Sequence, residues 1–316
     1  MILEGLYNLR TEWCLECPLT ISAVNTVMNT SHLLLLCIFI SLSQLSSLAA
    51  RMLNDQTGFD QNYAISWGRD HVRVLDRGSR VQLSMDKSSG SGFSSKLAYD
   101  SGFFGLSIKT PGKDTAGVVT AFYLASNARS HDELDFEFMG NKEGEPVTLQ
   151  TNIFTNGYGN REQRLHLWFD PSNGFHDYKI LWNPYHIVFF VDDTPVRIFR
   201  NQTNKGFKYV SQPMNVIASL WNGEDWATNG GKDKIKWGKD PFIAEFQSFN
   251  VDGCSSNGSN KLQQCSSSNF WWNVGMYKEL TPAQEIAYQK VQKSLSYDYC
   301  TDKKRFSVMP PECKYQ

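Results

Sequence analysis

Between about residues 63 and 250, short runs rich in β-branched and aromatic residues alternate with turn-forming residues. The clearest runs are 72–76, 80–85, 103–109, 118–125, 164–169, 178–182 and 186–191. The breaks between them contain turn dipeptides such as Pro111-Gly112 and Asn156-Gly157. Because no helical spacing of apolar residues separates the runs, the pattern predicts an all-β fold, an antiparallel sandwich or jelly roll.

One helix is predicted near the end of the chain. Thr281-Pro282-Ala283-Gln284 supplies an N-cap, a proline at the first helical position and a glutamine at N3, and a helix-compatible run follows to about Tyr297. We therefore expect a β-jelly-roll domain over residues 51–269 and a short helical C-terminal extension over residues 270–316.

The N-terminal region contains an apolar run at residues 33–48, followed by Ala49 and Ala50. This pattern predicts a signal peptide over residues 28–50, cut after one of these alanines. An uncleaved anchor helix is the alternative, but the serines within the run leave it too short to span about 30 Å of hydrocarbon. Residues 1–27 are an upstream extension, and we expect a secreted mature protein without a membrane span.

Four cysteines lie in the part expected to be secreted. Cys254 is close in sequence to Cys265, and Cys300 is close to Cys313, which predicts two local disulfides in an oxidising compartment. The Cys14-x-x-Cys17 pair has no second pair, so it is weak support for zinc. The 31 Lys and Arg nearly balance the 32 Asp and Glu, which gives no indication of nucleic acid or an anionic membrane as a partner.

Residues 131–138, HDELDFEF, alternate carboxylates with apolar residues from Glu133 onward. On an extended strand this period of two places Glu133, Asp135 and Glu137 on one face and the apolar residues on the other. A row of mutually repelling acids lowers stability unless it serves a function.

Three interpretations of this acidic row are open from the residues alone. Retaining glycoside hydrolysis needs two carboxyl groups about 5–5.5 Å apart, whereas Glu133 and Glu137 would be about 13 Å apart on a straight strand. Catalysis therefore requires side chains that lean together on a curved sheet. The row could instead bind calcium or form a solvated acidic face.

Further polar and aromatic residues could join Glu133 and Glu137 in a cleft. Gln150 and Asn152 share one face of the next expected strand, and Asn160, Glu162 and Arg164 share one face of the strand after it. Amide and guanidinium groups in such rows suit hydroxyl-rich ligands, and Tyr123 would point to the same side. Trp221 and Trp226 lie among polar and glycine residues, where they serve either as core residues or as platforms for sugar rings.

Four segments together resemble a known family. They are HDELDFEFMG at 131–140, GNREQRLHLWFDP at 159–171, SLWNGEDWAT at 219–228 and YDYCTDKKRF at 297–306. The chain from Gly58 to Cys313 is similar to the plant xyloglucan endotransglucosylase/hydrolases of glycoside hydrolase family 16. The resemblance implies a concave β-jelly roll that cuts the β-1,4-glucan backbone of xyloglucan with retention, in the cell wall or apoplast, without a metal or other cofactor.

The resemblance also implies roles for individual residues. Glu133 would be the nucleophile, Asp135 the assisting aspartate and Glu137 the acid/base, brought together on a bent strand. The implied sugar-binding residues are Tyr123, Gln150, Asn152, Asn160, Glu162, Arg164, Trp221, Asp225, Trp226, Gly230 and Arg305.

The expected activity is transfer from a xyloglucan donor chain to a xyloglucan acceptor chain by a monomeric enzyme. The compact stretch 219–241 resembles the transferases of the family, and the alternatives are an endo-hydrolase or a non-catalytic sugar-binding module. Asn141 does not begin a glycosylation sequon, whereas Asn201 and Asn257 do.

Overall fold

The computed structural model describes residues 57–256 and 264–315. The predicted signal peptide, the upstream extension and the sequon at Asn257 lie outside these residues. Within the described part of the chain, no helix is both long and apolar enough to cross a membrane.

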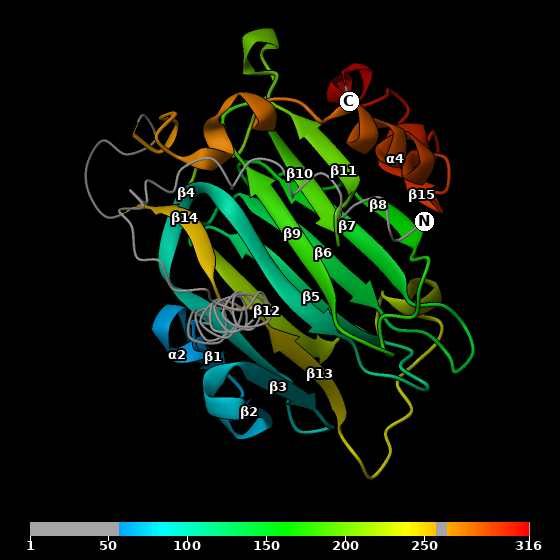
Figure 1. Ribbon diagram of the computed structural model, residues 1–316. Coiled ribbons are helices and arrows are strands. Elements are labelled where there is room, and N and C mark those ends of the chain that lie inside the picture. Colours follow the sequence, from blue (N-terminus) through cyan, green and yellow to red (C-terminus); the bar gives the residue numbers. More distant parts are fainter. Residues whose placement is uncertain (1–56, 257–263, 316) are drawn as a thin grey trace, which may run out of the picture. The chain divides into compact units, whose positions relative to one another are not determined.

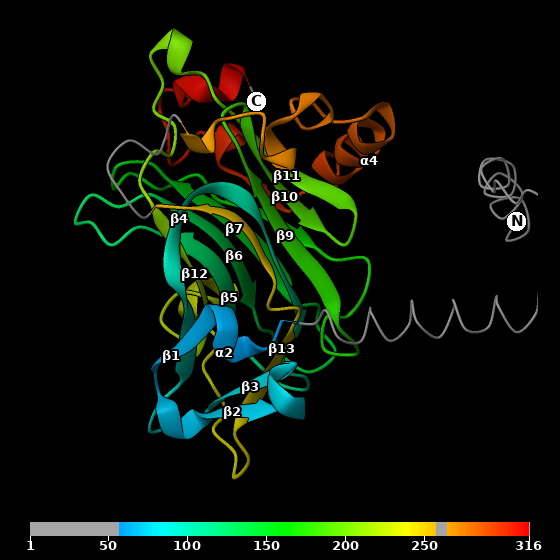
Figure 2. The same cartoon turned by 60° about the vertical axis from the view of Figure 1, so that its left-hand side comes forward.

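Within the described residues, the strands form two antiparallel layers (Figures 1 and 2). The layer that carries the acidic strand, here called the carboxylate sheet, runs in the order β1-β4-β12-β5-β6-β7-β8-β15. Its strands are β1 (Tyr63–Trp67), the first half of β4 (Ser91–Lys109), β12 (Met214–Asn222), β5 (Val118–Ala125), β6 (Glu133–Met139), β7 (Thr148–Phe154), β8 (Gln163–His166) and β15 (Tyr297–Asp298). Figure 2 shows these strands curving. The predicted antiparallel β-sandwich is confirmed.

The second layer, here called the covering sheet, packs against the core-facing side of the carboxylate sheet, opposite the side that carries Glu133 and Glu137. It contains the second half of β4 with β9 (His176–Trp182), β10 (His186–Val191), β11 (Thr194–Arg200), β14 (Val251–Ser255), β13 (Phe242–Gln247), β3 (Arg80–Met85) and β2 (Val72–Leu75). β4 therefore belongs to both layers, since its first half pairs with β1 and β12 and its second half pairs with β9, β13 and β14.

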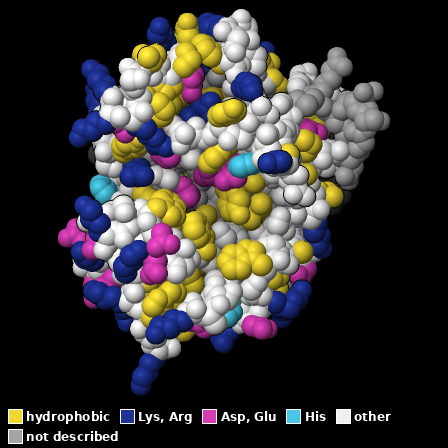
Figure 3. Space-filling view, turned by 180° about the vertical axis from the view of Figure 1, so that it is seen from behind, with side chains coloured by type: hydrophobic (Ala, Val, Ile, Leu, Met, Phe, Trp, Pro, Cys, Tyr) yellow, Lys and Arg dark blue, Asp and Glu magenta, His cyan; other side chains and the backbone are white. Residues whose placement is uncertain are grey.

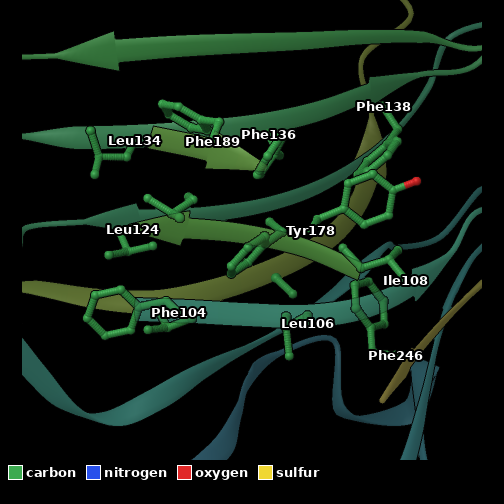
Figure 4. Packing of buried hydrophobic residues seen from close by; sticks show 14 of the residues in the cluster. Phe104, Leu106, Ile108, Leu124, Leu134, Phe136, Phe138, Tyr178, Phe189 and Phe246 are labelled. Atoms are coloured by element: carbon green, nitrogen blue, oxygen red, sulfur yellow. The ribbon is translucent and has the colours of Figure 1, made fainter. Parts of the chain in front are cut away.

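The core lies between the two sheets and is rich in aromatic rings. Leu134, Phe136 and Phe138 point inward from β6 and are at most 1% exposed. Phe136 meets Phe189 of β10 edge to face at 5.1 Å, and Phe138 meets Tyr178 of β9 in the same way at 4.6 Å (Figure 4). This packing fixes the inner face of β6, so its carboxylates must face outward.

The C-terminal helix α4 (Pro282–Gln292) begins as predicted, with a capping box between Thr281 and Gln284. It ends at Gln292, earlier than the predicted Tyr297. Tyr297 and Asp298 instead form β15, which pairs with β8 and overrides the local helix propensity. The structure also contains the disulfides Cys254–Cys265 and Cys300–Cys313, the pairs expected from the sequence.

The other helical segments that lie wholly within the described residues are short. They are α2 (Phe59–Asn62) and the 3₁₀ turns Arg69–His71, Asp76–Gly78, Thr203–Lys205, Thr228–Gly231, Trp271–Asn273, Gly275–Tyr277, Tyr299–Thr301 and Pro311–Lys314.

One predicted strand is shorter than expected. The sequence predicts a strand over 164–169 with Asn160 and Glu162 on its polar face, but β8 covers only Gln163–His166. Asn160 has a φ of +64°, which no strand accommodates. The Asn152 carboxamide oxygen accepts from the Arg161 backbone N–H at 3.0 Å, which holds this preceding segment as a loop.

Candidate active site

The three predicted carboxylates, those of Glu133, Asp135 and Glu137, lie on the outer face of β6 in the carboxylate sheet. Asp135 stands opposite Tyr123 of β5 and Asn152 of β7, and Glu137 stands opposite Gln150 of β7. Directly opposed residues in an antiparallel sheet share a face, so the polar residues predicted on neighbouring strands gather around the acids. This face is hollowed, and acidic side chains lie there among hydrophobic ones (Figure 3).

Glu137 is held by a chain of polar contacts that runs towards β8. The Gln150 amide donates to a Glu137 carboxylate oxygen at 2.6 Å, and Arg164 Nε donates to the Gln150 carbonyl oxygen at 2.7 Å. The Arg164 guanidinium lies 5.1 Å from the centre of the Tyr297 ring, over its face. Glu137 is thus oriented towards β7, on the side of the C-terminal extension.

The environment of Glu137 favours its protonated form. Burial raises the pKa of Glu137 to about 7, with a further contribution from the negative charge of Glu133, while the Gln150 hydrogen bond and the Arg164 charge act in the opposite direction. A carboxyl group that is half protonated near neutral pH can donate a proton and later accept one.

Asp135 lies between the two glutamates and is buried. Burial raises its pKa well above the ordinary range, and the charges of Glu133 and Glu137 and a hydrogen bond with Glu133 raise it further. A protonated Asp135 can donate that hydrogen bond to a carboxylate oxygen of Glu133. Burial and the same carboxylates raise the pKa of Tyr123 to about 12, so its hydroxyl remains a donor.

Glu133 has a further partner that the sequence did not single out. His131 Nε2 lies 3.2 Å from a Glu133 oxygen, and the His131 ring stacks on Phe154 of β7 at 5.1 Å. The histidine therefore restricts the orientation of Glu133. The only sequence signal was its place at the start of the acidic motif.

Asp132, the remaining acid of the motif, has a structural role. One carboxylate oxygen accepts from the Asn156 N–H at 2.6 Å, and the other accepts from the N–H groups of Ser211 and Gln212 at 2.7 and 3.0 Å. These bonds anchor the start of β6 to two loops. Asp132 thus does not share the cleft with Glu133.

Arg305 of the C-terminal extension contacts the loop before β8. It donates to Glu162 at 2.6 Å and also to Asn160, and it lies 3.3 Å from the Tyr297 hydroxyl. Three of the residues implied by the resemblance are thereby brought into one group. Asn152, in contrast, uses its carboxamide oxygen to hold the backbone of residues 153 and 161.

Trp221 and Trp226 lie 6.0 Å apart with a 37° angle between their rings. Both are partly buried against a small cluster that contains Val119 of β5 and Met139 of β6. Neither ring is therefore fully buried in the core or fully exposed to solvent. Near them, the exposed Asp225 forms an ion pair with Lys234 at 3.0 Å, and Gly230 has a φ of +65° in the 228–231 turn.

The calcium interpretation of the acidic row has no geometric support in residues 57–256 and 264–315. Within these ranges, no three His, Cys, Asp or Glu side chains are grouped so that they could hold a metal ion.

Comparisons with known proteins show the family of the chain. The sequence profile "Glycosyl hydrolases family 16" matches residues 59–239, and "Xyloglucan endo-transglycosylase (XET) C-terminus" matches residues 265–313. The chain is 58% identical to "Putative xyloglucan endotransglucosylase/hydrolase protein 1" of Arabidopsis thaliana, over 82% of this chain and 88% of that protein. The chain belongs to the xyloglucan endotransglucosylase/hydrolases of glycosyl hydrolase family 16.

Other relatives in this family cover similar shares of the chain. "Xyloglucan endotransglucosylase/hydrolase protein 2" of Arabidopsis thaliana is 53% identical over 81% of this chain and 89% of that protein. A probable member from Nicotiana tabacum is 46% identical over 90% of this chain and 98% of that protein. A solved Bacillus licheniformis β-glucanase has a TM-score of 0.49 at 23% identity, over 59% of this chain and 89% of that one, which is too distant to support an assignment.

Proposed function

We propose that this protein is a retaining xyloglucan endotransglucosylase, which cuts the β-1,4-glucan backbone of xyloglucan and joins the cut end to another xyloglucan chain. The observation that carries the proposal is the outward row Glu133, Asp135 and Glu137 on β6, in which Glu137 has a pKa of about 7. The names of the family's curated members supply the substrate.

The first step forms a glycosyl-enzyme. A Glu133 carboxylate oxygen attacks the anomeric carbon, the bond from that carbon to the leaving oxygen breaks, and Glu137 gives its proton to the leaving oxygen. Asp135 and His131 orient Glu133 for the attack. The released chain carries the new hydroxyl, and Glu137 is left as a carboxylate.

The second step regenerates the enzyme. The 4-hydroxyl of an acceptor chain attacks the same carbon, its proton passes to Glu137, and Glu133 leaves as a carboxylate. Water can take the place of the acceptor and would give hydrolysis. Water is far more concentrated, so transfer dominates only if binding holds the acceptor in attack geometry, an effect that can reach about 7–11 kcal/mol.

The extension supplies part of the proposed acceptor side. We propose that residues 51–269 form the catalytic domain and that residues 270–316 complete its cleft, since β15 extends the carboxylate sheet and Arg305 contacts Glu162. The protein would act outside the cell as a monomer, on donor and acceptor chains in the plant cell wall.

The direct test is to incubate the secreted protein with xyloglucan and a labelled xyloglucan oligosaccharide. We expect label to enter polymer while few new reducing ends appear at saturating acceptor. Release of reducing ends without transfer would show an endo-hydrolase, and binding without any change in chain length or label would show a sugar-binding module.

A further inference from the structure

A tryptophan outside the predicted site lies on the same face of the carboxylate sheet as Glu137. Directly opposed residues on neighbouring strands share a face of the sheet. Following these pairs from strand to strand therefore gives a row of residues on one face. The row runs Trp67, Gly92, Ser219, Ala121, Glu137, Gln150, Arg164, Tyr297, from β1 to β15. Trp67 is therefore at one end of this row and Tyr297 is at the other.

The two halves of this row differ in chemistry. On the β15 side of Glu137 the row carries the polar groups of Gln150 and Arg164. On the β1 side, Ala121, Ser219 and Gly92 carry nothing larger than a hydroxymethyl group. Four interstrand steps separate Glu137 from Trp67, about 19 Å along the sheet at about 4.8 Å per step. This distance spans several sugar rings.

Gly92 of β4, which has no side chain, leaves space for the Trp67 indole. A Cβ atom built on Gly92 would lie 2.5 Å from Trp67 Nε1. One built on Gly90 would lie 3.1 Å from the far edge of the same ring, but it would first meet the Leu220 carbonyl oxygen, at 2.1 Å. Gly92 has no φ in the left-handed region, so its backbone does not require glycine. What requires glycine there is the indole that lies over it.

The indole nevertheless remains accessible. Trp67 is 40% exposed, so part of its ring surface reaches solvent. Its strand β1 is at the edge of the carboxylate sheet beside β4 (Figure 2). An indole that lies over a glycine floor and is open to solvent offers a flat apolar face to the C–H groups of a sugar ring.

The orientation of Glu137 assigns this platform to one side of the scissile bond. The Gln150 amide draws the Glu137 carboxylate towards β7, so the leaving oxygen that it protonates lies on that side. The sugar that becomes attached to Glu133 then lies on the β5 side, towards Trp67. We propose that Trp67 is a donor-side binding residue, which stacks on a distal glucosyl ring of the chain segment that stays bound to Glu133. This assignment rests on the proposed function.

The test compares donor and acceptor kinetics in Trp67→Ala and Trp67→Phe. With labelled xyloglucan oligosaccharide saturating and xyloglucan varied, we expect Trp67→Ala to raise the donor KM about tenfold, equivalent to about 1.4 kcal/mol. Trp67→Phe should recover part of this loss, and the acceptor KM should stay within about twofold in both variants. An unchanged donor KM, or a larger effect on the acceptor KM, would overturn the proposal.

Two further variants separate stacking from a general effect on the fold. Trp271→Ala removes a similarly exposed tryptophan, 37% exposed, that packs with Phe103 of the second half of β4, and its donor KM should stay unchanged. Gly92→Ala alone should raise the donor KM, because the added methyl group displaces the indole. In a protein that already carries Trp67→Ala, the same substitution should raise the donor KM little further. Additive effects in this pair would mean that Gly92 acts independently of Trp67.

Binding can be judged without turnover. In the Glu133→Gln protein, addition of xyloglucan should quench tryptophan fluorescence. The double variant Glu133→Gln, Trp67→Ala should bind xyloglucan about tenfold more weakly. Equal binding by the two proteins would overturn the proposal. If the wild-type protein neither cuts nor transfers, the proposed function fails, and this titration alone decides whether Trp67 contacts the glucan.

Discussion

Glu133, Asp135 and Glu137 illustrate what alternation in a sequence can and cannot predict about individual residues. The period of two placed the acids on one face of β6 and Leu134 and Phe136 in the core, as the structure has them. The raised pKa values of Asp135 and Glu137 could not be inferred from that pattern, because they result chiefly from burial by other strands.

Trp67 was missed for a related reason. The register of β1 shifts between Ile65 and Trp67, so simple alternation does not indicate which face the indole occupies. The available signal was Gly92, whose significance depends on its pairing with β1 in the folded protein.

The first prediction concerns the reacting carboxylates. Glu133→Gln should lower turnover by several orders of magnitude because an amide cannot form the glycosyl-enzyme, and Glu137→Gln should impair both the acid and the base step. Both variants should keep the melting temperature of the wild type, since the amide has the size and shape of the carboxyl group that it replaces. Near-normal rates of cleavage in either variant would refute the assignment.

The second prediction concerns pH. Glu137 must be protonated to act as the acid, so the rate of the first step should fall as pH rises through about 7, the pKa of Glu137. Gln150→Leu removes a hydrogen bond that lowers this pKa. The alkaline limb of the pH–rate profile should therefore move to higher pH in the variant, whereas a shift to lower pH would contradict the role given to Gln150.

At the scale of elements, strands rich in β-branched and aromatic residues were predicted well, and β4 was not. The sequence indicated only its second half, residues 103–109, because the first half contains Ser91, Gly92, Ser94 and Ser95. Small residues disfavour strand formation locally, but here β1 and β12 pair with both edges of this segment and make it a central strand. Tertiary pairing likewise ended α4 early and formed β15.

The third prediction concerns the C-terminal extension. Cys300–Cys313 closes a loop that contains Arg305, so replacing both cysteines by serine should lower the free energy of unfolding by about 2–4 kcal/mol. It should also weaken acceptor binding, because Arg305 would lose its fixed position against Glu162. Thermal unfolding and acceptor KM measure the two effects.

The Cys254→Ser, Cys265→Ser double variant is the control for the third prediction. This bridge packs in a separate cluster with Trp272 and Tyr288, so its loss should lower stability without changing the acceptor KM. If both double variants change the acceptor KM equally, the link between the extension and the acceptor is wrong.

At the scale of the whole molecule, the balance between transfer and hydrolysis depends on how long the complete cleft holds an acceptor. The fourth prediction is that Trp226→Ala lowers the ratio of label transferred to reducing ends released, because a stacking contact with the acceptor is lost. We expect a change of several-fold, measured over a series of acceptor concentrations. Trp168→Ala, which removes an exposed tryptophan beyond the end of β8, should leave the ratio unchanged.

Equal losses of transfer and cleavage in Trp226→Ala would place this residue with the donor or the fold instead. Free release of reducing ends by the wild type at saturating acceptor would identify the protein as a hydrolase despite its compact 219–241 segment.

The position of β12 between β4 and β5 also determines when the protein can fold during its synthesis. β4 to β7 leave the ribosome long before residues 214–222, so the edges of β4 and β5 that β12 later joins stay open while the chain grows. Such edges readily pair with other chains, and contacts this distant in sequence form slowly. A chain cut short before Met214 would therefore retain all three carboxylates of β6 yet be unable to complete the sheet that holds them, and it would tend to aggregate.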